Sequence, residues 1–268
     1  MTNELHREGY LLFFIPGSCG RLIGNIVYKL ISNDLTKIEL TEYNSAHNSI
    51  DSANFHFAMN KDRLLEMAAD SFEKNNMPIV INHLSFDEGL VNFSKTTNKN
   101  IISIKLNDEN LSEVSLNAVI KNVFPRLLQV LNNKPLSERE QWVVDIHTQQ
   151  YLNLAGKKLE PEILVDPQKM QEYLEFIVSE PRVNIFRNHY RNFIEDTFPK
   201  NKKMFQVSYN NMFERNSNGK YSTLVELANW LNVKYNDDVH NLYDVYIKGQ
   251  NYVFEKYCPW FVRENKHD

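Results

Sequence analysis

Residues 10–31 read YLLFFIPGSCGRLIGNIVYKLI, which is an apolar run, a short loop with two glycines and an amphipathic run in direct succession. The apolar run at 10–15 predicts a fully buried strand, and the spacing of apolar residues over 22–31 predicts a helix. When a strand, a loop and a helix follow in this order, the loop N–H groups and the helix N-terminus point at one spot and favour an anion there. The loop at 16–21 is therefore a candidate binding site for phosphate or a similar anion.

The loop differs from the two best-known phosphate-binding loops. A Walker loop has the pattern GxxxxGK followed by Ser or Thr, and a dinucleotide-binding loop has the pattern GxGxxG. The loop PGSCGR contains Gly17 and Gly20 but no Lys-Ser or Lys-Thr. An alternative interpretation is an ordinary turn that needs glycine for a positive φ. Arg21 favours the anion site, because a cation in the first helical turn opposes the helix dipole unless an anion lies nearby.

Composition limits the class of protein. The chain has 268 residues, 42% of them hydrophobic, and a formal net charge of −4. This length predicts one α/β domain over 1–268, with a helix-rich part around 133–200 on the substrate side. The negative charge argues against broad nucleic-acid coating, so we expect no nucleic-acid partner.

Cysteine content and hydropathy predict a cytoplasmic protein that does not bind membranes. The only cysteines are Cys19 and Cys258, which cannot form a disulfide framework and fit a reducing compartment. The first ten residues contain no apolar signal segment. We also find no run of about 18 apolar residues, the length that a membrane span needs.

Strand and helix patterns alternate along the rest of the chain. The predicted strands are 37–42, 78–81, 100–106 and 204–208. The predicted helices are 61–75, 111–131 with a break near Pro125, 141–154, 166–178, 183–198, 224–231 and 239–257. Residues 161–165 fit either a loop or a strand. This alternation predicts a mostly parallel sheet flanked by helices. Ligands of such sheets bind at the carboxyl ends of the strands. The residues expected on that rim are 17–21, His83, 105–107 and Tyr209.

Two groups of polar residues lie where such a site needs them. His83 follows a predicted strand, which suits acid or base chemistry near pH 7. Lys105 closes the next strand, and Ser112 and Ser115 open the following helix, where they are able to hold a second phosphate. Each residue also has an ordinary alternative: a histidine satisfied by local hydrogen bonds, a solvated lysine and helix-capping serines.

In order along the chain, these segments resemble the sulfotransferases that use 3′-phosphoadenosine 5′-phosphosulfate (PAPS). PGSCGRL at 16–22 is similar to the family's loop Pro-Lys/Arg-Ser-Gly-Thr-Thr, and VINHLSF at 80–86 is similar to its strand ending in His-Leu-Pro. IISIKLND at 101–108 is similar to a strand that ends near an Arg-Asn pair. MFQVSYNNMFE at 204–214, followed by STLVELANWLNV, is similar to an element of the type Ser-Tyr-Glu-Asp-Leu before a helix. Lys248-Gly249 is similar to part of the family's C-terminal Arg-Lys-Gly loop.

The resemblance implies a P-loop-like α/β fold and transfer of a sulfuryl group from PAPS to the hydroxyl of a small molecule or a glycan. His83 is the implied base, and Ser18 and Arg21 are the implied groups that stabilise the developing charge. Gly17 stands where the family usually has Lys or Arg, so that Arg21 takes this role from the helix. The implied PAPS-binding residues are Gly17, Ser18, Cys19, Gly20, Arg21, Leu22, Lys105, Ser112 and Ser115.

Three other functions stay open. A non-catalytic, degenerate P-loop protein that binds a nucleotide or a partner is favoured by the missing loop lysine. A kinase-like phosphotransferase is disfavoured, because no Asp for Mg²⁺ follows a predicted strand. A hydrolase with Cys19 as nucleophile and His83 as its base is the third. The eight histidines form neither HExxH nor a His/Cys cluster, so no metal site is predicted, and no motif indicates an oligomeric state.

Overall fold

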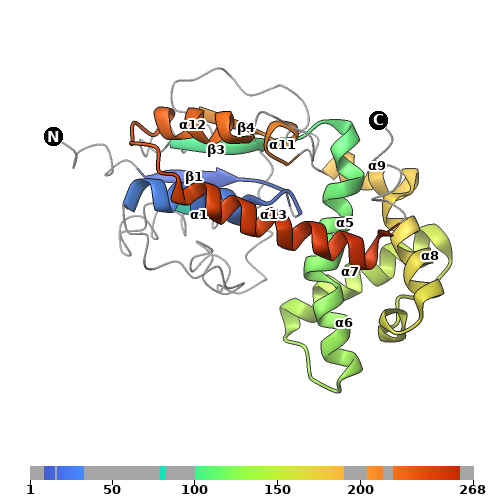
Figure 1. Cartoon of the computed structure of the whole chain (residues 1–268). Helices are drawn as coiled ribbons and strands as arrows, with labels where there is room; N and C mark the ends of the chain where they lie inside the picture. The colour runs from blue at the N-terminus through green and yellow to red at the C-terminus, as the bar shows by residue number, and fades with distance from the viewer. Residues whose placement is uncertain are drawn as a thin grey trace. The chain divides into compact units, whose positions relative to one another are not determined.

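The computed structural model of the chain describes residues 9–15, 17–32, 79–82, 100–189, 204–213 and 220–259 (Figure 1). The chain divides into two units, each with its own internal packing. The first unit comprises Met1–Ile15, Cys19–Asn107 and Tyr190–Ile247, and the second comprises Pro16–Ser18, Asp108–His189 and Lys248–Asp268.

The first unit contains a small, wholly parallel sheet. Its strands are β1 (Tyr10–Phe13), β2 (Ile79–Asn82), β3 (Asn100–Lys105) and β4 (Met204–Ser208), in the order β2-β1-β3-β4. Strand β1 has β2 on one side and β3 on the other. The strand order therefore reverses direction beside β1, and the gap between the carboxyl ends of β1 and β3 is the topological switch point where ligands of open α/β sheets bind.

The helices of the first unit cover an apolar face of the sheet. They are α1 (Gly20–Ser32), α11 (Tyr209–Phe213), α12 (Lys220–Trp230) and the first part of α13 (Asp238–Tyr257). Figure 1 shows α12 beside β3 and β4, and the ring of Trp230 lies 5.9 Å from that of Tyr10 and 5.5 Å from that of Phe205. Leu12 and Ile102 are fully buried on this face.

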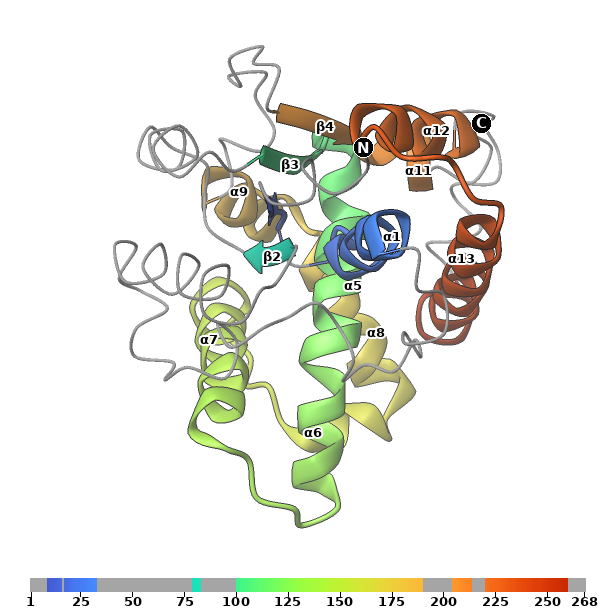
Figure 2. The ribbon, with the colours of Figure 1, turned by 90° about the vertical axis from the view of Figure 1, so that its left-hand side faces the viewer.

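The second unit is helical. Its helices are α5 (Leu111–Asn122), α6 (Phe124–Leu131), α7 (Glu138–Ala155), α8 (Pro167–Val178) and α9 (Glu180–His189), with short 3₁₀ turns η3 (Asp108–Asn110) and η4 (Pro161–Leu164). Helix α8 packs against α5, and α7 contacts α6. Figure 2 shows α8 beside α5. Leu116, Val119, Tyr173 and Ile177 lie in the core that these helices enclose.

Local signals explain where these helices begin and end. Pro125 lies in the first turn of α6, so the predicted long helix at 111–131 is divided into α5 and α6. Ser137 and Glu140 form a reciprocal capping box at the start of α7, and Gly156 ends that helix with a φ of 67°. The Asp166 side chain accepts hydrogen bonds from two N–H groups in the first turn of α8.

The predicted α/β class with a mostly parallel sheet is confirmed, although helix predominates and the sheet is small. Of the two structures predicted for 161–165, the strand does not form, and Pro161–Leu164 is the short 3₁₀ turn η4. Lys248-Gly249 lies inside α13, which agrees with the helix predicted at 239–257 and differs from the loop that the resemblance implies. The strand predicted at 37–42 and the helix predicted at 61–75 lie outside the described residues. Within the described part of the chain, no helix is both long and apolar enough to cross a membrane.

Candidate functional site

The loop between β1 and α1 turns through two residues of positive φ. Gly17 has a φ of 92° and Cys19 has a φ of 63°. A left-handed conformation costs a non-glycine residue about 1–2 kcal/mol, so Cys19 is held there by its surroundings. Loops that mix left- and right-handed residues turn successive N–H groups to one side, which is how backbone forms an anion-binding concavity.

Helix α1 begins directly after Cys19. The Cys19 carbonyl accepts hydrogen bonds from the N–H of Leu22 at 3.0 Å and of Ile23 at 3.3 Å. The Leu22 N–H, one of the predicted ligand-binding groups, is therefore already used inside the helix. The N–H groups of Gly20 and Arg21 lie in the first turn, where no carbonyl group of the helix is placed to accept from them. These two N–H groups therefore point out of the helix end.

Close packing explains why both loop positions, 17 and 20, are glycine. A Cβ added at Gly17 would lie 2.0 Å from the carbonyl oxygen of Val114 and 2.9 Å from the nitrogen of Ala118, both in α5. A Cβ added at Gly20 would lie 2.0 Å from Cγ of Phe14. The sequence identified these glycines through a phosphate-binding pattern, but close packing by itself already requires them.

The side chains of the loop are enclosed. Ser18 and Leu22 are fully buried, and Cys19 is 5% exposed. The loop would therefore contact a bound anion chiefly through its backbone. Buried cysteines are poorly reactive, so the enclosure of Cys19 favours its interpretation as a small residue in a tight loop over a nucleophile.

The side chains of two predicted catalytic residues, Arg21 and His83, are not among the described parts of the chain. Arg21 lies in the first turn of α1, but its side chain lies outside what the structure describes. His83 also lies outside the described residues, directly after β2. Its neighbour Asn82 is paired in register with Phe13, the last residue of β1. The predicted role of His83 as base remains a prediction.

The carboxyl ends of all four strands meet at one edge of the sheet, as parallel pairing requires. Lys105 at the end of β3 lies opposite Ser208 at the end of β4. The Ser208 hydroxyl accepts a hydrogen bond from the N–H of Asn211 at 3.3 Å in the first turn of α11. Asn107 is exposed near this edge, whereas the side chain of Tyr209 is buried and packs on Phe213. Lys105 is thus brought to the expected edge, and Tyr209 contributes to the core.

Ser112 and Ser115 lie on α5 in the second unit, whereas Lys105 belongs to the first unit. Their predicted joint binding of a phosphate remains a prediction. The Ser115 side chain is 1% exposed, and its Oγ makes no hydrogen bond to any described residue. A buried hydroxyl without a partner is unusual in folded proteins, so a ligand oxygen is one group that would satisfy it.

The start of α5 is acidic, although the sequence suggested an anion site there. Asp108 and Glu109 lie in η3 and Glu113 lies in the first turn of α5. Asp108 Oδ1 pairs with Nε of Arg187 at 3.0 Å, and this hydrogen bond raises the pKa of Arg187. These carboxylates suit the helix dipole but repel a phosphate, so anion binding at this helix end would need further cations.

Tyr243 connects several parts of the first unit. It lies on α13, and its hydroxyl donates a hydrogen bond to the Met212 carbonyl in α11. Its ring is stacked on that of Phe213 at 6.2 Å. Burial raises the pKa of Tyr243, and the nearby Cys19 thiol raises it further. Tyr243 therefore lies close to the loop residue of positive φ and ties α13 to α11.

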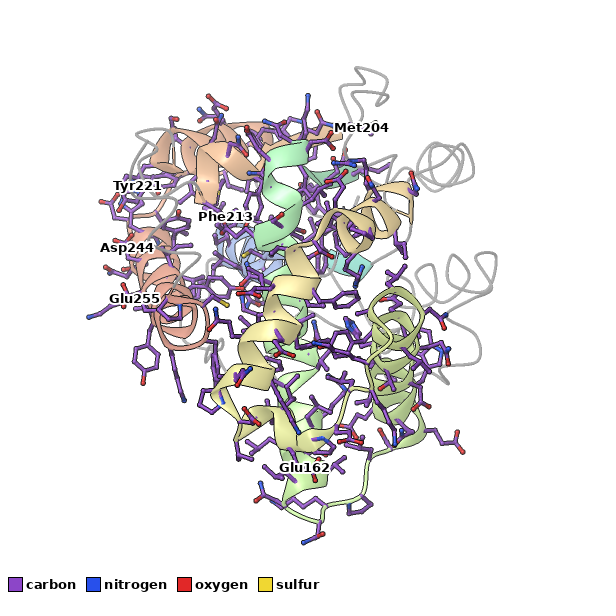
Figure 3. All side chains as sticks on the ribbon, turned by 90° about the vertical axis from the view of Figure 1, so that its right-hand side faces the viewer. Glu162, Met204, Phe213, Tyr221, Asp244 and Glu255 are labelled. Carbon is purple, nitrogen blue, oxygen red and sulfur yellow. The ribbon has the colours of Figure 1, made fainter. Side chains whose placement is uncertain are left out.

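The surface beside Tyr243 carries a second tyrosine, Tyr221 of α12. Its hydroxyl is 3.0 and 3.1 Å from the two carboxylate oxygens of Asp244, and Figure 3 shows both side chains on the outside of the unit. The contact is exposed, so it is a surface interaction rather than part of the loop's support.

His147 is a half-buried polar residue of α7 whose surroundings the sequence did not reveal. Its Nδ1 is 3.2 Å from the hydroxyl of the fully buried Tyr173. Burial lowers the pKa of His147 to about 3, and the positive charge of Arg182 lowers it further. His147 is therefore neutral at pH 7 and a weak base. It lies within a largely polar segment of α7, where no local pattern marks it as enclosed.

Comparison of the chain with protein-family models, with curated proteins and with solved structures gives no match. In the portion of the chain that the structure describes, no group of three or more His, Cys, Asp or Glu side chains is placed to hold a metal ion. The geometry that remains is a backbone loop and a helix N-terminus beside a lysine-bearing sheet edge, which suits an oxyanion.

Proposed function

We propose that this chain is a sulfotransferase, which binds PAPS at the carboxyl edge of its sheet and transfers the sulfuryl group to an acceptor hydroxyl. The observation that carries the proposal is the left-handed turn at Gly17 and Cys19 between β1 and α1, beside the switch point of a parallel sheet. We also propose that the fold is a P-loop-like domain with a helix-rich insertion.

Three features support an anionic ligand at this edge. The N-terminus of α1 carries partial positive charge, and the Gly20 and Arg21 amides open its first turn. Lys105 at the end of β3 adds a full positive charge to the same edge. The left-handed conformation of Cys19 has a free-energy cost, and such strain is found where function requires a particular backbone shape.

The reaction follows from the roles of the chain's own residues. His83 accepts the proton of the acceptor hydroxyl as its oxygen forms a bond to sulfur. The bond from sulfur to the bridging oxygen breaks in line, and the electron pair leaves with adenosine 3′,5′-bisphosphate (PAP). The loop amides and Arg21 meet the charge that develops on the oxygens, and each preorganised donor of this kind is worth about 3 kcal/mol in the transition state.

The binding part of the proposal is tested by calorimetric titration with PAP, with ATP as the comparison ligand. We expect PAP to bind the wild type, ATP to bind more weakly, and Arg21→Ala to weaken PAP at least tenfold. Lys29→Ala is the matched control, because it removes a cation from the last turn of the same helix. Equal binding to wild type and Arg21→Ala, or no binding of PAP, would identify the loop as a structural turn.

The catalytic part is tested with His83→Ala. We expect this variant to bind PAP like the wild type and to transfer sulfate at least a hundredfold more slowly. Turnover at the wild-type rate would exclude His83 as the base.

A second candidate is a nucleotide-binding protein without catalysis. The complete burial of Ser18 favours it, because that side chain is then poorly placed to touch a transferring group. Tight PAP binding combined with no turnover on phenol, alcohol and sugar acceptors would support this second function.

A further inference from the structure

The register of β3 and β4 gathers four polar side chains on one face of the sheet. Ser103 lies opposite Gln206, and Lys105 lies opposite Ser208. Side chains along a strand alternate between the two faces, and directly paired residues share a face. The four residues therefore form one polar patch at the carboxyl end of the sheet, which we call the β3–β4 polar face.

The opposite face of the same two strands is apolar. Ile102 is paired with Phe205, and Ile104 with Val207. This is the face that α12 covers, since the ring of Trp230 lies 5.5 Å from that of Phe205. The other face is mixed: the buried Ile101 is paired there with Met204, and the four polar residues follow this pair toward the carboxyl end of the sheet.

The β3–β4 polar face contains an unsatisfied donor. Nε2 of Gln206 is enclosed and makes no hydrogen bond to any residue within the described ranges. Ser103 beside it is 1% exposed, and Gln206 itself is half-buried. An enclosed N–H donor without an acceptor disfavours the folded state, and native proteins rarely keep one without a functional reason.

We infer that Gln206 is a ligand-binding residue, which donates through Nε2 to an oxygen of an oxyanion held on the β3–β4 polar face. The Lys105 ammonium attracts the anion, and the Ser103 hydroxyl is a further hydrogen-bonding group. None of the four residues is acidic, so the chemistry fits a phosphate or sulfate ester rather than a cation. In naming the ligand as a phosphate group of PAP, the inference rests on the proposed function.

The position of the patch agrees with this chemistry. Ser103 is paired with Phe13 at the end of β1 as well as with Gln206. The patch therefore begins at the gap between β1 and β3, where the strand order reverses and ligands of such sheets bind. Gln206 lies in the segment MFQVSYNNMFE, but the resemblance of that segment concerns the Ser-Tyr element that follows Gln206, so no sequence pattern marks Gln206 itself.

The test uses Gln206→Leu, which keeps the volume of the side chain and removes its polar group. Because the donor is unsatisfied without ligand, we expect this variant to have a urea midpoint equal to or above that of the wild type. We expect the same variant to bind PAP about tenfold more weakly, since one hydrogen bond to a charged oxygen is lost. Gln206→Glu places a negative charge on the patch, so PAP binding falls further.

Gln141→Leu is the matched control. Its Nε2 bonds Asp145 Oδ1 at 2.7 Å on the exposed side of α7, so the substitution removes a satisfied amide far along the chain. We expect it to leave PAP binding unchanged and the urea midpoint unchanged or slightly lower. A lowered midpoint for Gln206→Leu together with unchanged PAP binding would overturn the inference.

Failure of the inference is distinct from failure of the proposed function. If Arg21→Ala weakens PAP and Gln206→Leu does not, the nucleotide site stands and the role of Gln206 is refuted. If PAP does not bind but inorganic sulfate raises the melting temperature of wild type and not of Gln206→Leu, the oxyanion patch is supported and the nucleotide is refuted. If neither PAP nor sulfate affects the wild type, both are refuted.

Discussion

Replacing Gly17 by alanine tests whether the loop is held by its packing. The new Cβ would lie 2.0 Å from the Val114 oxygen and 2.9 Å from the Ala118 nitrogen, and both are backbone atoms that cannot rotate away. Gly17 also has a φ of 92°, which alanine adopts only at a cost of about 1–2 kcal/mol. Overpacking adds about 1–3 kcal/mol. We expect Gly17→Ala to lower the free energy of unfolding by about 2–5 kcal/mol.

Three other glycines separate the cost of the positive φ from the cost of overpacking. Gly156 has a φ of 67° with nothing within 4 Å of an added Cβ, so Gly156→Ala should cost only the conformational part, about 1–2 kcal/mol. Gly20 has no positive φ, but its Cβ would meet the Phe14 ring at 2.0 Å, so Gly20→Ala should cost about 1–3 kcal/mol through packing alone. Gly249 is helical with open space around it, so Gly249→Ala should stabilise by about 0.5–1 kcal/mol.

Urea unfolding, followed by circular dichroism on all four variants, gives the free energies to compare. The PAP titration, repeated on Gly17→Ala, asks whether displacement of the loop also weakens ligand binding. If Gly17→Ala is no more destabilising than Gly156→Ala, the close approach of the loop to α5 is refuted.

Two further predictions concern buried polar groups. The pKa of His147 is about 3 in the folded state against 6.5 for the free side chain, so between these values the unfolded state binds more protons and stability falls as the pH drops. His147→Gln should therefore reduce the slope of unfolding free energy against pH by up to about 1.4 kcal/mol per pH unit between pH 4 and 6. An unchanged slope would refute the lowered pKa of His147. Tyr243→Phe removes the hydroxyl that donates to the Met212 carbonyl, and it should lower the free energy of unfolding in urea by about 1–2 kcal/mol. The surface variant Tyr221→Phe should lower it by less than about 0.5 kcal/mol. Equal costs would contradict the buried hydrogen bond of Tyr243.

Most secondary structure could be predicted because its causes are local. Apolar periodicity located the four described strands and all the longer helices, and Pro125 marked the division between α5 and α6. Two segments show the limits of local patterns. Residues 161–165 combine a proline with apolar residues, which suits a strand end as well as the 3₁₀ turn that forms over Pro161–Leu164. The helix predicted at 239–257 forms as α13 and contains Gly249, because a long helix tolerates one glycine.

The candidate site could be predicted only in part. The sequence located the glycine loop and placed Lys105 at the end of a strand, and parallel pairing brings that strand end to the edge where β1 also ends. The burial of Ser18 and Cys19, by contrast, depends on what packs over the loop. Side-chain type indicated a polar loop, and only the surrounding chain determines that these groups are enclosed.

The sequence by itself determined the order of strand, loop and helix, the division of a long helix at Pro125, and the need for a flexible loop residue at Gly17. Each of these follows from dihedral preference, capping or side-chain period within a few residues. Only the tertiary structure decided that Gly17 lies against the backbone of α5, that Gln206 lies opposite Ser103, and that the His147 ring meets the hydroxyl of the buried Tyr173. The physical reason is that these features come from the pairing of segments roughly a hundred residues apart, or of helices whose facing sides no local period identifies.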